Sequence, residues 1–106
     1  MTTLNEKDLH NALFIQLVLQ FQTSAMIGMG KLKNPITDKV EVNLDQAKIS
    51  IDMLDMIKTK MKGNLSEEED RFITTVIRDL KLNYVDEVNK KQTETQKAIE
   101  KTEEKT

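Results

Sequence analysis

The feature that most constrains the fold is the stretch of residues 9–30, which contains no Lys, Arg, Asp or Glu. Large apolar side chains occupy most directions of its helical wheel, and only Gln16, Gln20 and Thr23 form a narrow polar gap. A helix that is apolar on nearly every side must be surrounded by other helices, because exposing it to water is costly. We therefore predict a surrounded first helix over about residues 6–29.

A loop and a second helix follow. The only proline, Pro35, and a weak alternation of apolar residues predict a loop over residues 31–43, in which a short hairpin remains an open alternative. Asn43 followed by Gln46 is typical of a helix start. Apolar residues then recur at helical spacing and predict a second helix over about residues 44–62. The apolar stripe consists of Leu44, Ala47, Ile51, Leu54 and Met61, widened by Ile49, Met53, Met56 and Ile57. Its methionines are predicted to fill gaps in the core, with an adaptable groove for a partner helix as the alternative.

The strongest local signal is the turn between the second and third helices. Gly63 can adopt the left-handed backbone that ends a helix, and Asn64 follows it in the turn. Ser66 and Glu69 have the spacing of a capping box, so a third helix is predicted over about residues 67–88 or beyond. Because few residues separate these two helices, we expect an antiparallel hairpin that packs on the first helix.

The chain is therefore predicted to be all-α, with a single helical domain over residues 1–88. Three glycines and one proline are too few for the frequent turns of an all-β fold. Residues 89–106 contain only Ala98 and Ile99 as apolar residues and are rich in lysine and glutamate, so they cannot build a core. We predict a charged, polar extension that is either a frayed continuation of the third helix or disordered.

Several segments resemble a bacterial protein family that is known only as a domain of unknown function. The resemblance rests on the Asn-Leu-x-x-Ala-x-x-x-Ile-Asp-x-Leu pattern of residues 43–54 and on the Lys-Gly-Asn-Leu-Ser-x-Glu-Glu turn of residues 62–69. The final Leu-x-x-x-Tyr segment of residues 80–84 also fits. The similarity extends over about residues 10–88.

This resemblance implies a fold and no activity. Family members are helical proteins about as long as this chain, with an apolar first helix, a proline-containing loop and two further helices. The sequence departs from the family pattern at Met61, where threonine is common, and at Lys81, where arginine is common. The family supplies no catalytic residue to carry over.

Composition argues against most catalytic and metal chemistry. With no cysteine and one histidine, His10, the chain has no thiol nucleophile and no Cys/His zinc site. The acidic run of residues 67–70 lacks the spacing of a calcium loop. We therefore predict no catalytic residue, no cofactor, no metal ion and no enzyme. A formal net charge of −2 predicts no nucleic-acid partner. The N-terminal residues lack the pattern of a secretory signal, so a cytoplasmic location is expected.

The first helix is predicted to bind a second copy of the chain. Two neighbouring helices cannot cover a helix that is apolar nearly all round, and a second copy is the simplest supplier of a third neighbour. Small residues would allow two such helices to approach closely. The predicted oligomer interface consists of Leu13, Leu17, Leu19, Phe21, Ala25, Met26, Gly28 and Met29.

Two hypotheses for the function follow. The first is a non-enzymatic, homo-oligomeric helical module for protein interaction, which presents the third helix and the tail to another protein. The alternative is a peripheral membrane or lipid-binding protein that uses the apolar first helix. Polar side chains such as Gln16 and Gln20 make it costly for that helix to cross a bilayer.

Overall fold

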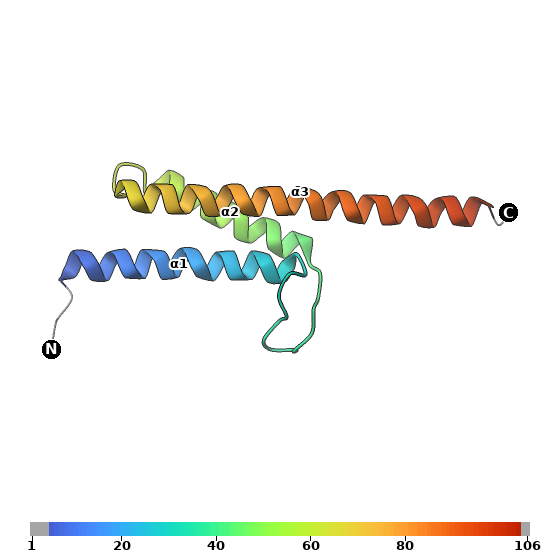
Figure 1. Cartoon of the computed structure of the whole chain (residues 1–106), viewed down its shortest axis with the longest axis horizontal. Coiled ribbons are helices and arrows are strands. Elements are labelled where there is room, and N and C mark those ends of the chain that lie inside the picture. The colour runs from blue at the N-terminus through green and yellow to red at the C-terminus, as the bar shows by residue number, and fades with distance from the viewer. Residues whose placement is uncertain (1–4, 105–106) are drawn as a thin grey trace.

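Three helices and one long loop make up the computed structural model, which describes residues 5–104 and their side chains as far as Lys101. The helices are α1 (Glu6–Gly28), α2 (Leu44–Lys60) and α3 (Glu67–Glu104). Figure 1 shows α1 and α3 lying along the long axis, while α2 runs back diagonally from the end of α1 to the start of α3. No strand occurs among the described residues, so the all-α prediction is confirmed.

Side chains cap the starts of α2 and α3. Asn43 Oδ1 accepts a hydrogen bond from the backbone N–H of Gln46 at 3.1 Å. At α3, Ser66 Oγ accepts a hydrogen bond from the N–H of Glu69 at 3.1 Å, and Glu69 Oε1 accepts one from the N–H of Ser66 at 2.9 Å. This reciprocal pair satisfies amides that have no partner within the helix. Just before it, Gly63 has a φ of 90°, which reverses the chain between α2 and α3.

The core lies where the three helices meet. Val18, Leu54 and Ile73, one from each helix, are completely buried. The other buried apolar side chains are Phe14, Ala25, Met29, Ala47, Ile51, Ile57, Val76, Ile77 and Leu80. On each helix these residues recur every three or four positions, so each helix contributes one face. Burial of these faces is the main force that holds the three helices together.

Within one chain, α2 and α3 cover one side of α1, so its complete enclosure remains a prediction that depends on a further neighbour. Its buried positions Phe14, Val18 and Ala25 form a single stripe, and large apolar side chains outside that stripe are exposed. The reason is that α2 and α3 also pack against each other and therefore contact α1 on neighbouring sides. No further helix packs on α1 among the described residues, and the loop lies near its last turns, beside Gln20, Thr23 and Ile27.

The loop between α1 and α2 projects away from the helices (Figure 1). Two antiparallel backbone bridges close it, one between Met29 and Val42 and one between Asn34 and Lys39. Ile36 lies near its tip and is 92% exposed. The loop therefore has the shape of a hairpin, although it forms no regular strands.

The helix α3 continues past the three-helix body. It has 38 residues and is therefore about 57 Å long. All described side chains from Asn89 to Lys101 are exposed. Of the two alternatives for the C-terminal extension, the structure shows a continuation of the third helix through Glu104. Residues 1–4 of the predicted helical domain and residues 105–106 of the predicted extension lie outside the described residues.

Candidate interaction surface

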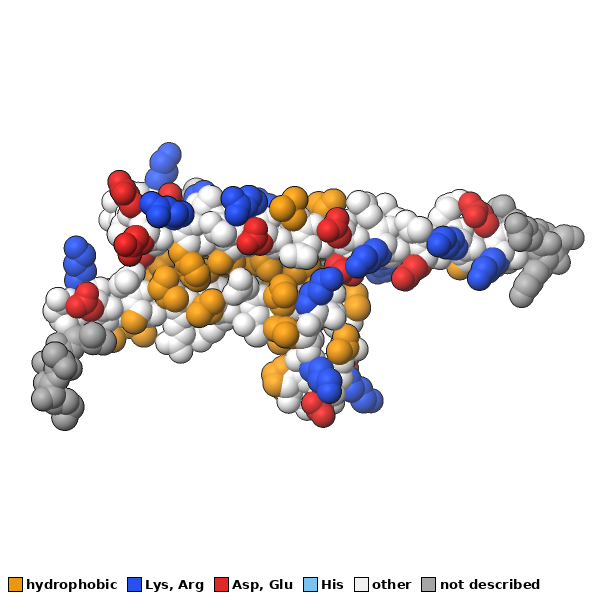
Figure 2. Space-filling model, viewed as in Figure 1, with side chains coloured by type: hydrophobic (Ala, Val, Ile, Leu, Met, Phe, Trp, Pro, Cys, Tyr) orange, Lys and Arg blue, Asp and Glu red, His pale blue; other side chains and the backbone are white. Residues whose placement is uncertain are grey.

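The outer surface of α1 is the candidate site, because large apolar side chains are exposed on a helix without charge beyond its first turn. Leu13, Leu17 and Leu19 are 51%, 39% and 43% exposed. The charged residues of α1 are all in its first turn, at positions 6–8. The surface of α3 is different, because it carries many lysine, arginine, aspartate and glutamate side chains (Figure 2). Hydrophobic side chains gather between α1 and α3.

The eight residues that we predicted as an oligomer interface fall into three groups. Three leucines, Leu13, Leu17 and Leu19, are exposed. Phe21 and Met26 are partly buried and pack against the core. The remaining three residues, Ala25, Gly28 and Met29, are buried within the chain. These three are therefore not available to a second copy.

The assignment of the small residues of α1 to a second copy is corrected, because Gly28 faces α2 of the same chain and Ala25 is completely buried in the core. A Cβ atom placed on Gly28 would lie 2.8 Å from the backbone oxygen of Asn43 and 2.9 Å from the backbone nitrogen of Ala47. The N–H of Asn43 also donates a hydrogen bond to the carbonyl oxygen of Gly28 at 2.8 Å. The close approach expected between two copies thus occurs inside one chain.

A polar seam shows which flank of α1 borders α2. Ser50 Oγ, on α2, donates a hydrogen bond to Ser24 Oγ at 2.9 Å, and Gln46 Nε2 donates to the same oxygen at 3.3 Å. Leu17 precedes Ser24 by two helical turns and Leu13 precedes Leu17 by one, so all three lie along one line of α1. Leu13 and Leu17 therefore lie on the flank of α1 that borders α2.

Part of the predicted apolar stripe of α2 is exposed. Ile49, Met53 and Met56 are 56%, 37% and 42% exposed, so the preferred core assignment is wrong for the two methionines, and the part of the stripe that Ile49 widens also lies outside the core. The cause is again the small number of neighbours, because α1 and α3 cover only the side of α2 that carries Leu54. The signal was the width of the apolar stripe, which is greater than one core face requires.

The exposed stripe of α2 and the exposed leucines of α1 flank the same junction between the two helices. Gln46 reaches α1 through its bond to Ser24, and Met53 lies two turns after Gln46 on the same line of α2. Leu17 occupies the corresponding line on α1. Leu19 lies on the opposite flank of α1, since two residues correspond to a rotation of about 200°.

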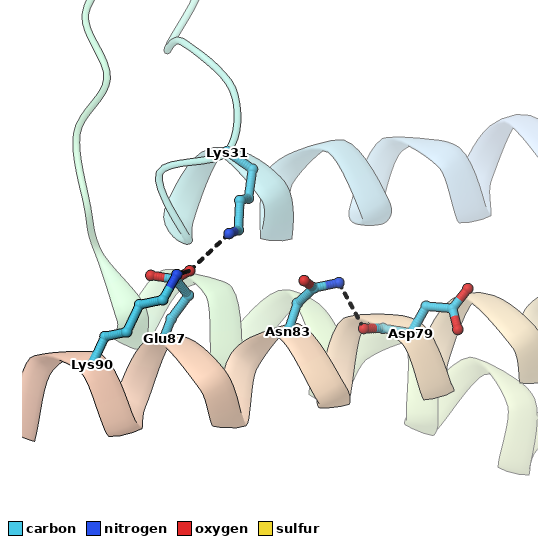
Figure 3. A network of polar contacts seen from close by, with 5 residues as sticks. All are labelled: Lys31, Asp79, Asn83, Glu87 and Lys90. Carbon is cyan, nitrogen blue, oxygen red and sulfur yellow. Dashed lines mark hydrogen bonds and ion pairs between the residues drawn. The ribbon is translucent and has the colours of Figure 1, made fainter.

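An ion pair fastens the end of α1 to α3. Figure 3 shows the Lys31 ammonium pointing from the end of α1 toward Glu87 on α3, with Lys90 on the other side of that carboxylate. Lys31 Nζ lies 2.8 Å and Lys90 Nζ 3.3 Å from Glu87 Oε1. The hydrogen bond from Lys31, assisted by that from Lys90, lowers the pKa of Glu87 below its ordinary value of 4.5.

This ion pair predicts a pH-dependent contribution to stability. Because its pKa is lower in the folded state, Glu87 stabilises the fold above pH 4.5, and the contribution disappears as the pH falls through the folded-state pKa. Glu87→Gln is expected to lower the free energy of unfolding by at most about 1 kcal/mol at pH 7. Urea denaturation at pH 7 and at pH 3 measures this, and an equal loss at both values would contradict it.

An open hollow of about 900 Å³ lies between the start of α1 and the turn that joins α2 to α3. Its walls include His10, Phe14 and Met61 together with the capping residues Ser66 and Glu69. His10 is exposed, and the two capping residues bond each other. Among the described residues, no three histidine, aspartate or glutamate side chains lie close enough together to hold a metal ion.

Comparison with known proteins identifies a family and no individual relative. A family model described as a domain of unknown function, DUF1844, matches residues 11–86. No curated protein and no solved structure matches the chain significantly. The match covers α1 from residue 11 onward, the loop, α2 and α3 as far as residue 86.

Proposed function

Because the chain belongs to DUF1844, a domain family of unknown function, we propose a function from its own surface. The protein is a non-enzymatic helical module for protein interaction, and it associates with a second copy of itself through the outer surface of α1. Three residues of the predicted interface remain exposed on α1: Leu13 and Leu17 on the flank that borders α2, and Leu19 on the opposite flank.

The exposed, uncharged surface of α1 carries this proposal. A helix that faces water normally bears charged residues on its exposed side, as α3 does. On α1, the exposed positions after the first turn hold three leucines together with His10, Asn11, Ala12, Gln16, Gln20 and Thr23. Burial of these leucines by a partner favours association, because each Å² of apolar surface removed from water contributes about 25 cal/mol of free energy.

The absence of charge favours a protein partner over a lipid one. Glutamine side chains can exchange hydrogen bonds across a protein interface, whereas burying them in hydrocarbon without partners is costly. Peripheral membrane helices usually carry lysine or arginine on their polar face, and Lys7 is the only such residue of α1. In the described part of the chain, no helix combines the length and the hydropathy required to cross a bilayer.

The arrangement of the polar side chains supports a non-enzymatic role. The buried hydroxyl group of Ser50 bonds Ser24, and Glu69 bonds the backbone at Ser66. These groups stabilise the helix junctions and do not converge in one pocket. The exposed half of α3 supplies a second surface, which we propose presents its charged residues to another protein.

Light scattering during size-exclusion chromatography tests the proposal. The 12.2 kDa chain is expected to elute with twice that mass. The double variant Leu13→Glu/Leu17→Glu is expected to elute as a monomer with unchanged helix content, because both side chains lie outside the core. Leu82→Glu is a matched control, since Leu82 is also exposed but lies on α3, and it is expected to leave the mass unchanged.

Two results would contradict the proposal. The first is a wild-type mass of 12.2 kDa that does not change with concentration. The second is a double variant that keeps the wild-type mass of a dimer. Monomeric protein that sediments with phosphatidylcholine vesicles would instead support the lipid-binding alternative.

A further inference from the structure

We infer that the second copy pairs with this chain through the exposed stripe of α2, with the two α2 helices antiparallel and the two-fold axis at Met53. This inference rests on the proposed self-association and adds the face and the register. It places the centre of the interface on α2, and not on the flank of α1 that carries Leu19.

The stripe is a continuous line of exposed residues along α2. Asp45, Ile49, Met53, Met56 and Lys60 follow one another at intervals of three or four residues, so they share one side of the helix. All five are exposed. The stripe has an acidic end, an apolar centre and a basic end.

This order of residues is self-complementary about Met53. In an antiparallel pair centred there, Asp45 lies beside Lys60 of the partner subunit, and Ile49 lies beside Met56 of the partner subunit. Asp45 and Lys60 are eight and seven residues from Met53, about 12 and 11 Å along the helix axis, so both ends match. A two-fold axis makes each of these contacts twice. A shallow crossing of about 20° keeps the two ends within reach of each other.

The two terminal charges of the stripe remain without an ion-pair partner in the described chain. Elsewhere on α2, Lys48 pairs with Asp52 at 2.8 Å, and Asp55 pairs with Lys81 of α3 at 2.8 Å. Neither Asp45 nor Lys60 forms an ion pair with any residue in the described part of the chain. Pairing with a second copy would satisfy both.

The neighbouring flank of α1 adds to the face that α2 offers a second copy. Leu17 and Met53 each lie two turns from the Ser24–Gln46 bond, on the matching lines of α1 and α2, so Leu17 is the residue of α1 that extends the apolar stripe of α2. With α2 about 26 Å long and two helices about 20 Å wide, the face covers on the order of 500 Å². A standard interface buries about 800 Å² per partner, so a dimer formed through this face has a small interface.

Cysteine cross-linking tests the register directly, because the chain contains no cysteine. Met53→Cys places one thiol at the proposed axis, where the two Cβ atoms can come within the roughly 4 Å that a disulfide requires. Mild oxidation is expected to convert most of this variant to a covalent dimer. Thr59→Cys is the matched control, since Thr59 is also exposed on α2 but lies off the stripe, and it is expected to stay uncross-linked.

A charge exchange tests the antiparallel direction. Asp45→Lys creates two contacts between like charges and is expected to raise the dissociation constant of the dimer roughly tenfold. The double variant Asp45→Lys/Lys60→Asp restores opposite charges and is expected to recover most of the affinity. Circular dichroism of each variant separates this effect from any change in the helix content of α2.

The outcomes separate the inference from the proposed function. A wild-type dimer in which Met53→Cys does not cross-link, or in which the charge exchange does not recover affinity, overturns the inference and leaves self-association intact. A dimer lost by Leu19→Lys but retained by Met53→Glu also overturns it, because the interface then lies on the other flank of α1. A wild-type monomer at all concentrations overturns both.

Discussion

Replacing Gly28 with alanine is expected to lower the free energy of unfolding by at least about 2 kcal/mol, although alanine is the better helix former by about 1 kcal/mol. The added Cβ would lie within 2.9 Å of two backbone atoms of α2, the oxygen of Asn43 and the nitrogen of Ala47. Backbone atoms cannot rotate away as the end of a side chain can. The helices α1 and α2 must therefore separate where they are closest.

Thermal denaturation followed by circular dichroism measures this loss, which corresponds to a fall of about 10 °C in the melting temperature. Gly63→Ala is the control, because its Cβ would meet no atom within 4 Å. The φ of 90° at Gly63 still disfavours alanine, so a loss of about 1 kcal/mol is expected there. If Gly28→Ala melts at the wild-type temperature, the close packing of α1 on α2 is wrong.

Replacing Leu54 with alanine is expected to destabilise the fold by about 2–5 kcal/mol, the largest effect of any single change considered. Leu54 lies completely buried in the middle of α2, so its removal leaves a cavity among the three helices. The adjacent residue Met53 provides a contrast. Met53→Ala is expected to change the stability of the monomer by less than about 1 kcal/mol, because its side chain is already exposed.

The two variants therefore separate folding from association. Urea denaturation of both, at one protein concentration, gives the stability change, and light scattering gives the mass. Leu54→Ala is expected to shift the urea midpoint strongly, whereas Met53→Ala is expected mainly to weaken the dimer. Equal shifts of the midpoint would show that Met53 is as buried as Leu54 and would contradict the structure.

The helices were predictable because their signals are local. Asn43 with Gln46 and Ser66 with Glu69 are within three residues of each other, and capping depends only on the chain around the helix start. The apolar periodicity of α2 and α3 also lies within single helices. These features predict the three helices from the sequence alone.

The surface was less predictable because it depends on how many neighbours each helix has. The wheel of α1 indicates that a third neighbour is needed, yet it does not show that Gly28 faces α2 of the same chain. The stripe at Met53 matches a core stripe in sequence, since methionine fills cores and lines surfaces equally well. Only the arrangement of the three helices distinguishes the two uses.

The exposed half of α3 has a consequence for helix formation. The part of α3 after residue 88 is roughly 16 residues long, and an isolated helix of about 15 residues is marginal in water because its first turn is hard to nucleate. Here the buried turns around Leu80 already supply the nucleus, so each later residue needs only to propagate an existing helix. Helix content beyond residue 88 should therefore decline gradually toward the C-terminus on warming, while the three-helix body melts in a single cooperative step.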